Sequence, residues 1–403
     1  MMTGENSQNS LYRWIILILF MLVNISSQIL WISYGPVTST AVAYYSVSES
    51  EILFLSTIFM IVYIPATFIT SWFTNRYGFK IGVGLGAVIN GVFGFLRFFA
   101  GPNYFLILFF HIMISIAQPF FLNSVTLLSA NWFPESERTT ASGLSVISQL
   151  LGIALGMVLT PILVIVFNFE VMIMIYGLFS LIVGILFVIL AKDKPSTKSS
   201  IKVTNKDVIL KGGLKPLLFN RLFWIVIIIF FAGLGAFNMV STYIELIVAP
   251  RGLTPIEAGN LGGIMLLGGI VGAIIMSILS DKLHKRSLLI KISLVATVIA
   301  FFAISYADTA ILLYIFGFAL GFGLLSVGPV LLEYAVEITI PVPETTSNGI
   351  LMMVGAVGGI IFIVGFEGIT TPSGDYLPTL IILSVLSLVT FILSFFLKDV
   401  KRG

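Results

Sequence analysis

Polar and aromatic side chains gather in the first apolar stretch of the sequence, around Trp31. Its neighbours are Asn24, Gln28, Ser33 and Tyr34. Polar groups in hydrocarbon need a partner or water, so a helix with this composition fits best along a water-filled cavity. An indole face attracts an organic cation by about 0.5–2 kcal/mol. Trp31 is therefore a candidate ligand-binding residue; the alternative is that Trp31 and Tyr34 belong to an interfacial aromatic belt.

Two carboxamides lie near the middle of later apolar stretches. Gln118 precedes Pro119, and Asn238 follows Phe237. A buried amide must be satisfied, either by a polar ligand or by a neighbouring helix at about 1 kcal/mol. Gln118 and Asn238 are therefore candidate ligand-binding residues, with bonding to a neighbouring helix as the alternative. Met60 is either part of the same pocket wall or ordinary packing.

Ionisable residues inside the apolar stretches are few, and they lie in the outer halves. They are Arg97, His111, Glu245 and Glu367. Such a residue costs on the order of 3 kcal/mol or more and is functional by default, although near a helix end it can extend to water. Glu245 and His111 are therefore candidates for coupling or ligand contact, with snorkelling or ion pairing as the alternative.

No catalytic constellation is present. The sequence has no Gly-x4-Gly-Lys-Ser/Thr phosphate loop and no His-Glu-x2-His motif; it contains 2 histidines and no cysteine. These absences argue against an enzyme or an ATP-driven pump and against thiolate chemistry. We expect no catalytic residue, no metal, no cofactor and no nucleic-acid partner.

The composition is that of an integral membrane protein. Of 403 residues, 58% are hydrophobic and 10% are charged, against about 25% charged in soluble domains. Stretches of about 20 apolar residues are long enough to cross a bilayer as helices. The sequence predicts twelve spans, at 13–35, 51–74, 81–100, 104–130, 139–167, 170–191, 221–249, 257–280, 287–307, 309–334, 344–370 and 376–397.

Basic residues divide the chain and orient it. The lysine-rich stretch 192–220 separates a six-span half at 1–191 from a six-span half at 221–403. All 21 Lys and Arg residues except Arg97 and Arg251 lie in the tails, in the even-numbered connections or beside them. Because positive loops stay in the cytoplasm, we predict a multi-pass plasma-membrane protein with both termini cytoplasmic.

Four charged residues at the predicted cytoplasmic side are candidates for gating or coupling. They are Arg76, Asp281, Glu333 and Glu337. Glu333 and Glu337 end the tenth span, where they would pair with Arg138 and Lys80 if the fold brings these together.

The two halves carry similar loops. Residues 71–80 and 277–286, which follow the second span of each half, are offset by 206 positions. Two repeated halves with a site near the bilayer midplane are the build of many secondary transporters.

These features resemble the major facilitator superfamily, whose loop motif Gly-x-Leu-Ala-Asp-Arg-x-Gly-Arg-Lys is kept in part at Arg76, Gly78 and Lys80. The motif implies a charge-based cytoplasmic latch. Longer stretches resemble the feline leukemia virus subgroup C receptor family of choline and heme-related transporters: Leu-Trp-Ile-Ser-Tyr-Gly at 30–35, Ser-Ile-Ala-Gln at 115–118 and Glu-Tyr-Ala-Val-Glu at 333–337.

The resemblance implies a choline pocket made by Trp31, Gln118 and the pair Phe237 and Asn238. Asn238 stands where that family has tyrosine, and Ala356 stands where it has glutamine. Part of the cage for a quaternary ammonium and one polar anchor are therefore missing.

Together these observations predict an all-α membrane protein of twelve transmembrane helices in two pseudo-symmetric halves, the major facilitator fold. We expect a monomeric secondary transporter in the lipid bilayer that moves a small organic solute by alternating access. The predicted mode is uniport of an amine or cation such as choline or ethanolamine. The alternatives are a proton-coupled transporter of another small metabolite and a non-transporting receptor.

Overall fold

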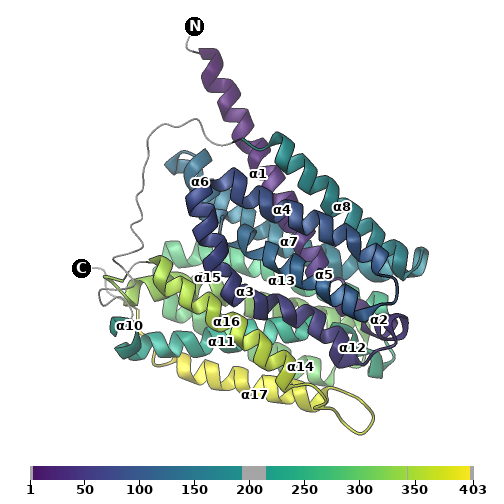
Figure 1. Ribbon diagram of the computed structural model, residues 1–403. Coiled ribbons are helices and arrows are strands. Elements are labelled where there is room, and N and C mark those ends of the chain that lie inside the picture. Colours follow the sequence, from purple (N-terminus) through teal and green to yellow (C-terminus); the bar gives the residue numbers. More distant parts are fainter. Residues whose placement is uncertain (1–2, 193–214, 343, 400–403) are drawn as a thin grey trace. The chain divides into compact units, whose positions relative to one another are not determined.

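The computed structural model describes residues 3–192, 215–342 and 344–399, and the regular secondary structure in these ranges is helical (Figure 1). Twelve helices in these ranges are long and apolar enough to span a membrane, which confirms the predicted number. The chain divides into two compact units, residues 1–199 and 200–403, and each contains six of the spans. Residues 193–214 of the predicted linker 192–220 lie outside the described residues.

The first unit is built from eight α-helices and two 3₁₀ turns in the described residues. They are α1 (Thr3–Ile32), η1 (Gly35–Val37), α2 (Thr38–Tyr45), α3 (Glu49–Tyr77), α4 (Phe79–Leu96), η2 (Arg97–Ala100), α5 (Tyr104–Leu122), α6 (Val125–Trp132), α7 (Glu135–Val166) and α8 (Phe169–Leu190).

The second unit follows the same plan. Its elements are α10 (Lys215–Phe219), α11 (Arg221–Thr242), α12 (Ile244–Val248), η3 (Ala249–Arg251), α13 (Pro255–Leu283), α14 (Arg286–Tyr306), α15 (Ala310–Ile338), α16 (Glu344–Gly365) and α17 (Leu377–Ser394).

Helix pairing is the same in both units. In the first unit α1 packs on α7, α3 on α5, and α4 on both α8 and α5. In the second unit α11 packs on α16, α13 on α15, and α14 on both α17 and α15. Counted by span, each unit therefore pairs its first with its fifth, its second with its fourth, and its third with its sixth and fourth, which confirms the predicted pseudo-symmetry.

The helix starts repeat at the offset that the sequence predicted. At the start of α3, the Ser48 hydroxyl accepts from the Glu51 N–H while the Glu51 carboxylate accepts from the Ser48 N–H. Thr254 and Glu257 form the same capping box at the start of α13, 206 positions later. A capping box satisfies two backbone donors that a helix start leaves without intrahelical partners.

Two further pairs of positions share this offset of 206. Asn103 caps α5 and Thr309 caps α15, each by accepting from the backbone N–H three residues on. Ser46 and Gly252 both adopt positive φ, at 55° and 80°, in the turns that precede the capping boxes. The repeat therefore extends from helix pairing down to individual caps and turns.

Three predicted spans are interrupted. The prediction of single runs at 104–130 and 221–249 was wrong, because α5 ends at Leu122 before α6 and α11 ends at Thr242 before α12. The first span breaks after Ile32, where η1 and α2 follow. Pro119 lacks an N–H and disrupts the ladder just before the end of α5, a local cause for one of these breaks.

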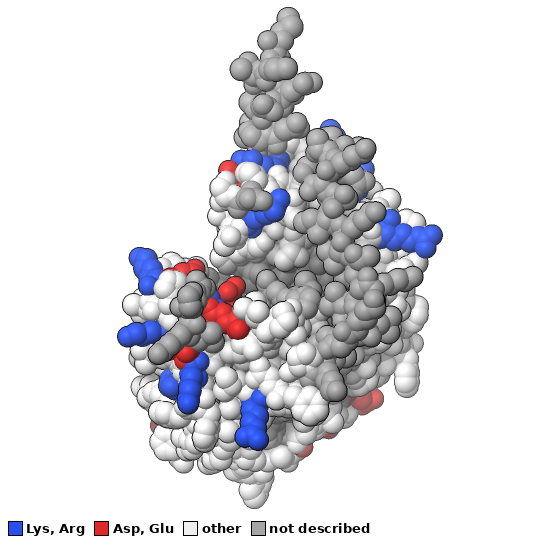
Figure 2. Space-filling view, turned by 90° about the vertical axis from the view of Figure 1, so that its left-hand side faces the viewer, with Lys and Arg blue, Asp and Glu red and all other residues white. Residues whose placement is uncertain are grey.

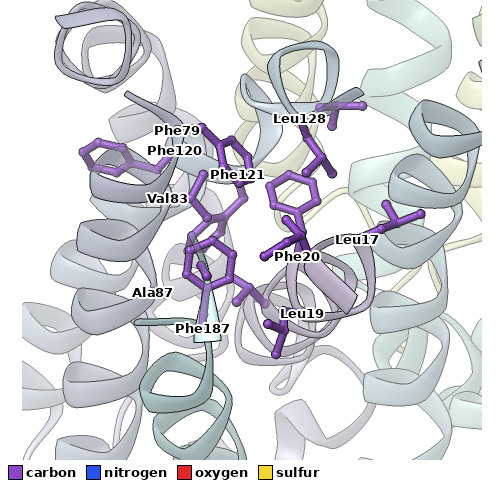
Figure 3. Close-up of a cluster of buried hydrophobic side chains, with 14 of the residues drawn as sticks. Leu17, Leu19, Phe20, Phe79, Val83, Ala87, Phe120, Phe121, Leu128 and Phe187 are labelled. Carbon is purple, nitrogen blue, oxygen red and sulfur yellow. The ribbon is translucent and has the colours of Figure 1, made fainter. Parts of the chain in front are cut away.

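Buried apolar side chains fill each unit. Figure 3 shows part of the core of the first unit, to which α1, α4, α5, α6 and α8 contribute. The ring of Phe79 lies 5.8 Å from that of Phe20 and 6.1 Å from that of Phe187, measured between centroids. Large apolar side chains also remain exposed, such as Phe105 at 80% and Ile311 at 71%, as expected for a surface solvated by lipid. Figure 2 shows that charged side chains are sparse over the described part of one face.

Glycine allows the closest helix contact in the second unit. A Cβ placed on Gly321 of α15 would lie 1.7 Å from the carbonyl oxygen of Met265 in α13. Because that neighbour is backbone, the two helices would have to separate. Small residues at such contacts let helices pack closely in a membrane, where van der Waals packing contributes to association.

We predict that Gly321→Ala lowers the free energy of unfolding by about 1–3 kcal/mol, the usual effect of overpacking. The measurement is thermal unfolding of the purified protein. Gly328→Ala in the same helix is the matched control, because nothing lies within 4 Å of its Cβ position. Equal melting temperatures for the two variants would contradict the close contact.

Candidate functional site

Trp31 lies inside the first unit at the end of α1. Its side chain is 5% exposed, and its Nε1 donates to the carbonyl oxygen of Ser56 in α3 at 3.2 Å. Tyr34 is 1% exposed. Neither residue therefore lies in a lipid-facing aromatic belt. The indole N–H is satisfied by α3, which fixes one edge of the ring and leaves cation–π contact to its faces.

The Gln118 carboxamide on α5 has no hydrogen-bond partner in the described part of the chain. The side chain is 7% exposed and forms no hydrogen bond to the described part of the chain, while its polar atoms keep some exposure. Gln28, one turn before Trp31 on α1, is 5% exposed and has the same properties. Two amides that are almost buried and have no protein partner among the described residues are available to hydrogen-bond a ligand or water.

Met60 lies on α3, one turn after Ser56, and is 7% exposed. The helices that carry Trp31, Met60 and Gln118 contact one another in pairs, since α1 packs on α3 and α5, and α3 packs on α5. The first unit therefore brings these predicted residues onto three adjoining helices. Phe59, next to Met60, instead packs edge-on against the His111 ring of α5 at 6.0 Å between centroids.

Phe237 and Asn238 lie on α11 in the second unit, with exposures of 5% and 8%. Asn238 donates through Nδ2 to its own helix at the Leu234 carbonyl, 2.8 Å away. Phe237 is 206 positions after Trp31, so the two aromatic residues occupy equivalent places in the repeat. Ala356 is 8% exposed on α16, the helix on which α11 packs.

Three of the four ionisable residues in the outer halves of the spans are buried in the protein, and only Glu367 is exposed. Arg97, His111 and Glu245 are 1%, 0% and 2% exposed, so snorkelling, which the sequence left open, is wrong for all three. Glu367 is exposed in the turn after α16. The His111 Nδ1 lies 3.0 Å from the Ile107 carbonyl, and its Nε2 is buried without a partner among the described residues.

The acidic pair at the end of α15 has a partner that the sequence did not indicate. Arg286, at the start of α14, contacts Glu333 at 3.3 Å and Glu337 at 3.0 Å. Arg138, one of the two predicted partners, instead donates to the carbonyls of Phe133 and Ala130. Within the second unit Glu333 and Glu337 therefore pair with Arg286. Their proximity to Arg138 and Lys80 of the first unit stays a prediction.

Arg76 and Asp281, the other gating candidates, are exposed within their own units. The Arg76 guanidinium lies over the rings of Trp72 and Tyr77, 5.4 Å and 5.5 Å from their centroids. A gating role for these two residues stays a prediction.

Two arginines, Arg97 and Arg251, have a structural role that the sequence did not indicate, although both are exceptions to its charge pattern. Arg97 donates to the Leu30 carbonyl at 3.5 Å. Arg251 donates to the carbonyls of Ile304 and Ala307 at 2.6 Å and 2.9 Å. Each arginine therefore satisfies carbonyls near the end of a helix, where intrahelical partners are lacking. Their departure from the basic-side pattern was the signal that could have identified this role.

The described residues contain no group of three or more His, Asp or Glu side chains placed to hold a metal ion. The two units contain buried aromatic rings, buried amides and a few buried ionisable side chains. The helices that carry them pack through small residues. Two repeated six-helix units with such residues define a membrane transporter of the secondary type.

The sequence matches the Major Facilitator Superfamily over residues 16–363. The chain belongs to this superfamily, and it is a transporter rather than an enzyme. The proposed resemblance to the narrower family is confirmed by relatives of known sequence. The chain is 28% identical over 411 residues to the choline/ethanolamine transporter flvcr2b of Danio rerio, covering 97% of this chain and 84% of that protein.

Two other relatives are similar over comparable lengths. Solute carrier family 49 member A3 of Xenopus tropicalis is 27% identical over 388 residues, 92% of this chain and 80% of that protein. The human choline/ethanolamine transporter FLVCR2 is 26% identical over 411 residues, 97% of this chain and 78% of that protein.

The fold also matches a solved structure. A bacterial homolog of the human lysosomal transporter Spinster, in an inward-facing and unoccupied conformation, has a TM-score of 0.71 at 12% identity. The match covers 95% of this chain and 97% of that one. It supports the twelve-helix architecture.

We predict that Glu337→Gln destabilises the protein more than Glu333→Gln. The Glu337 side chain is 21% exposed and that of Glu333 is 61% exposed, while Arg286 is 7% exposed. Loss of the more buried charged contact should cost about 1–3 kcal/mol, and loss of the exposed one less than about 1 kcal/mol. Thermal unfolding of both variants measures the difference, and a larger loss for Glu333→Gln would show that the exposed contact dominates.

Proposed function

We propose that the protein is a uniporter for a small organic amine or cation of the choline and ethanolamine class. The observation that carries this proposal is the buried Trp31 indole, whose N–H is bonded to Ser56 while an adjoining helix offers the unpaired amide of Gln118. A ring face attracts an ammonium group, and an amide can accept from a hydroxyl or amine. Relatives named choline/ethanolamine transporters support the same class of solute.

We further propose that transport occurs by alternating access in a plasma-membrane monomer with both termini cytoplasmic. The positions of the basic residues support this orientation. A negative-inside potential would drive a monovalent cation inward by about 2.3 kcal/mol per 100 mV.

Within the first unit we assign Trp31 to the ammonium group, Gln118 to the polar end of the solute and Met60 to the wall. Within the second unit, Phe237 is assigned to an aromatic contact and Asn238 to a polar one. Arg76, Asp281, Glu333 and Glu337 would act in gating. The assignment of the five candidate binding residues is supported by their burial, each within its own unit.

A proton-coupled carrier of another small metabolite is the second candidate. The observation that favours it is the burial of two titratable side chains, Glu245 at 2% exposure and His111 at 0%. Intramembrane groups of this kind are typical of proton relays. Uptake that responds to a clamped pH gradient, and loses that response in Glu245→Gln, would establish coupling and exclude simple uniport.

We predict that Trp31→Ala abolishes saturable uptake of labelled choline into proteoliposomes, because the cation loses an aromatic face. Trp31→Phe is the matched control. It keeps a ring but loses the bond to Ser56, so it should retain uptake, with a loss of affinity below the roughly 30-fold that removal of an entire cation–π contact would cost. Unchanged kinetics in Trp31→Ala would remove Trp31 from the binding site.

We predict that the double variant Asn238→Tyr with Ala356→Gln transports choline with a lower KM than the unmodified protein. It restores the tyrosine and glutamine that the resemblance places at these positions. Each added contact should contribute about 0.5–2 kcal/mol, so the two together should lower the KM about 5-fold or more. The measurement is the concentration dependence of choline uptake. An unchanged or higher KM in a folded double variant would show that these positions do not contact choline.

A further inference from the structure

Arg97 is a buried cation whose nearest partners are not acidic. It is 1% exposed, and among the described residues no carboxylate pairs with it. A buried charge with no compensation is strongly unfavourable, and inside a membrane it marks a functional position. The contacts that Arg97 does make should therefore explain why it is retained.

Those contacts all lie at the end of α1. The guanidinium donates through Nη1 to the Leu30 carbonyl at 3.5 Å and through Nη2 to the Ser33 hydroxyl at 3.1 Å. It also lies 5.0 Å from the centroid of the Tyr34 ring. A helix end carries unsatisfied carbonyls and a partial negative charge, so a cation placed there is stabilised without a carboxylate.

The residues that Arg97 contacts bracket Trp31. Leu30 comes directly before it, while Ser33 and Tyr34 follow it, and α1 ends at Ile32 between them. The break in the first span is thus held by a charge from η2, a different part of the unit. The backbone on either side sets the Cα–Cβ direction of Trp31, and the bond to Ser56 fixes one edge of its ring. The contacts that hold this break therefore act together with that bond in placing the indole.

Tyr34, whose ring lies next to the Arg97 guanidinium, also contacts three more helices. Its ring lies 5.3 Å from that of His111 in α5 and 5.9 Å from that of Phe169 in α8. Its hydroxyl lies 3.2 Å from that of Tyr45 in α2. The Leu30 carbonyl also accepts from the Ser33 hydroxyl at 3.1 Å, so the guanidinium binds both members of this hydrogen bond. The end of α1 is therefore packed from several sides, with the guanidinium as its charged partner.

We propose that Arg97 is a positioning residue for Trp31. By capping the end of α1 it holds the indole in the orientation that the solute meets. The effect on solute affinity rests on the proposed function, whereas the effect on the indole itself does not.

The first test reads Trp31 directly. In a protein that keeps Trp31 while Trp14, Trp72, Trp132 and Trp224 are replaced by Phe, its fluorescence reports its surroundings. Arg97→Gln should shift the emission to longer wavelength and make quenching by acrylamide faster. Arg251→Gln is the matched control, because it removes an arginine that caps carbonyls at the end of α14 in the second unit.

Arg97→Lys keeps the charge and guards against a failure of Arg97→Gln to fold. A single ammonium lacks the planar fork that reaches both Leu30 and Ser33, so the emission should shift in the same direction by a smaller amount. A folded Arg97→Lys protein whose Trp31 emission and quenching equal those of the parent would overturn the proposal.

The second test measures choline uptake by the same Arg97→Lys protein with all tryptophans restored. A misplaced ring should raise the KM by about 2- to 30-fold while the maximal rate changes little. A fluorescence shift with an unchanged KM in a protein that transports choline would overturn the link to the solute. A shift in a protein whose parent does not transport choline would contradict the proposed function and leave the positioning of Trp31 supported.

Discussion

The structure depends on one constraint: a polar group inside a bilayer must find its partner within the protein. Long helices meet most of this requirement through their own backbone hydrogen bonds. The places where helices begin, end or break need other partners, and the chain supplies them locally. Capping boxes at Ser48 and Thr254 serve two helix starts, and Arg97 serves the end of α1.

The same constraint explains where functional residues can lie. A break in a spanning helix releases backbone groups and turns side chains away from the regular helical face, so it is suited to a site where a solute meets the protein. In the first unit Trp31 lies at such a break. In the second unit Phe237 and Asn238 lie on α11 shortly before its end at Thr242. Because Trp31 and Phe237 are equivalent in the repeat, the two halves place aromatic residues near corresponding breaks.

Close helix packing supports these sites through small residues. A Cβ on Gly152 of α7 would lie 2.7 Å from the Ile25 carbonyl of α1, and one on Gly358 of α16 would lie 2.5 Å from the Phe231 carbonyl of α11. Both pairs are related by the offset of 206 positions. The helices that carry Trp31 and Phe237 are thus held by equivalent contacts in the two units.

Much of the fold was predictable because it follows from hydrophobicity and charge placement. Apolar length identified the spans, and two similar basic loops gave the offset that the caps later matched. The breaks were not predicted. Asn123, after α5, is satisfied by Thr67 and Ser71 of α3, a contact that needs the tertiary fold. The partner of Glu333 and Glu337 was missed for the same reason, since Arg286 reaches them from another helix.

The sequence could identify candidate site residues only by their type, as side chains with polar groups that need partners inside a membrane span. The sequence showed that Trp31, Gln118 and Asn238 needed partners, but it could not show which of these partners the protein itself provides. The structure separates them, because Trp31 bonds to Ser56 and Asn238 to its own helix, whereas Gln118 keeps its amide free among the described residues.

The proposed uniport moves one positive charge with each solute molecule and couples it to no other ion. The most direct measurement is the membrane potential at which net choline flux through reconstituted protein stops, for a known choline gradient and equal pH on both sides. Uniport of a monovalent cation predicts a change of about 60 mV for each tenfold gradient. A reversal potential that does not change with the choline gradient, or that moves when a pH gradient is imposed, would contradict uniport of a cation.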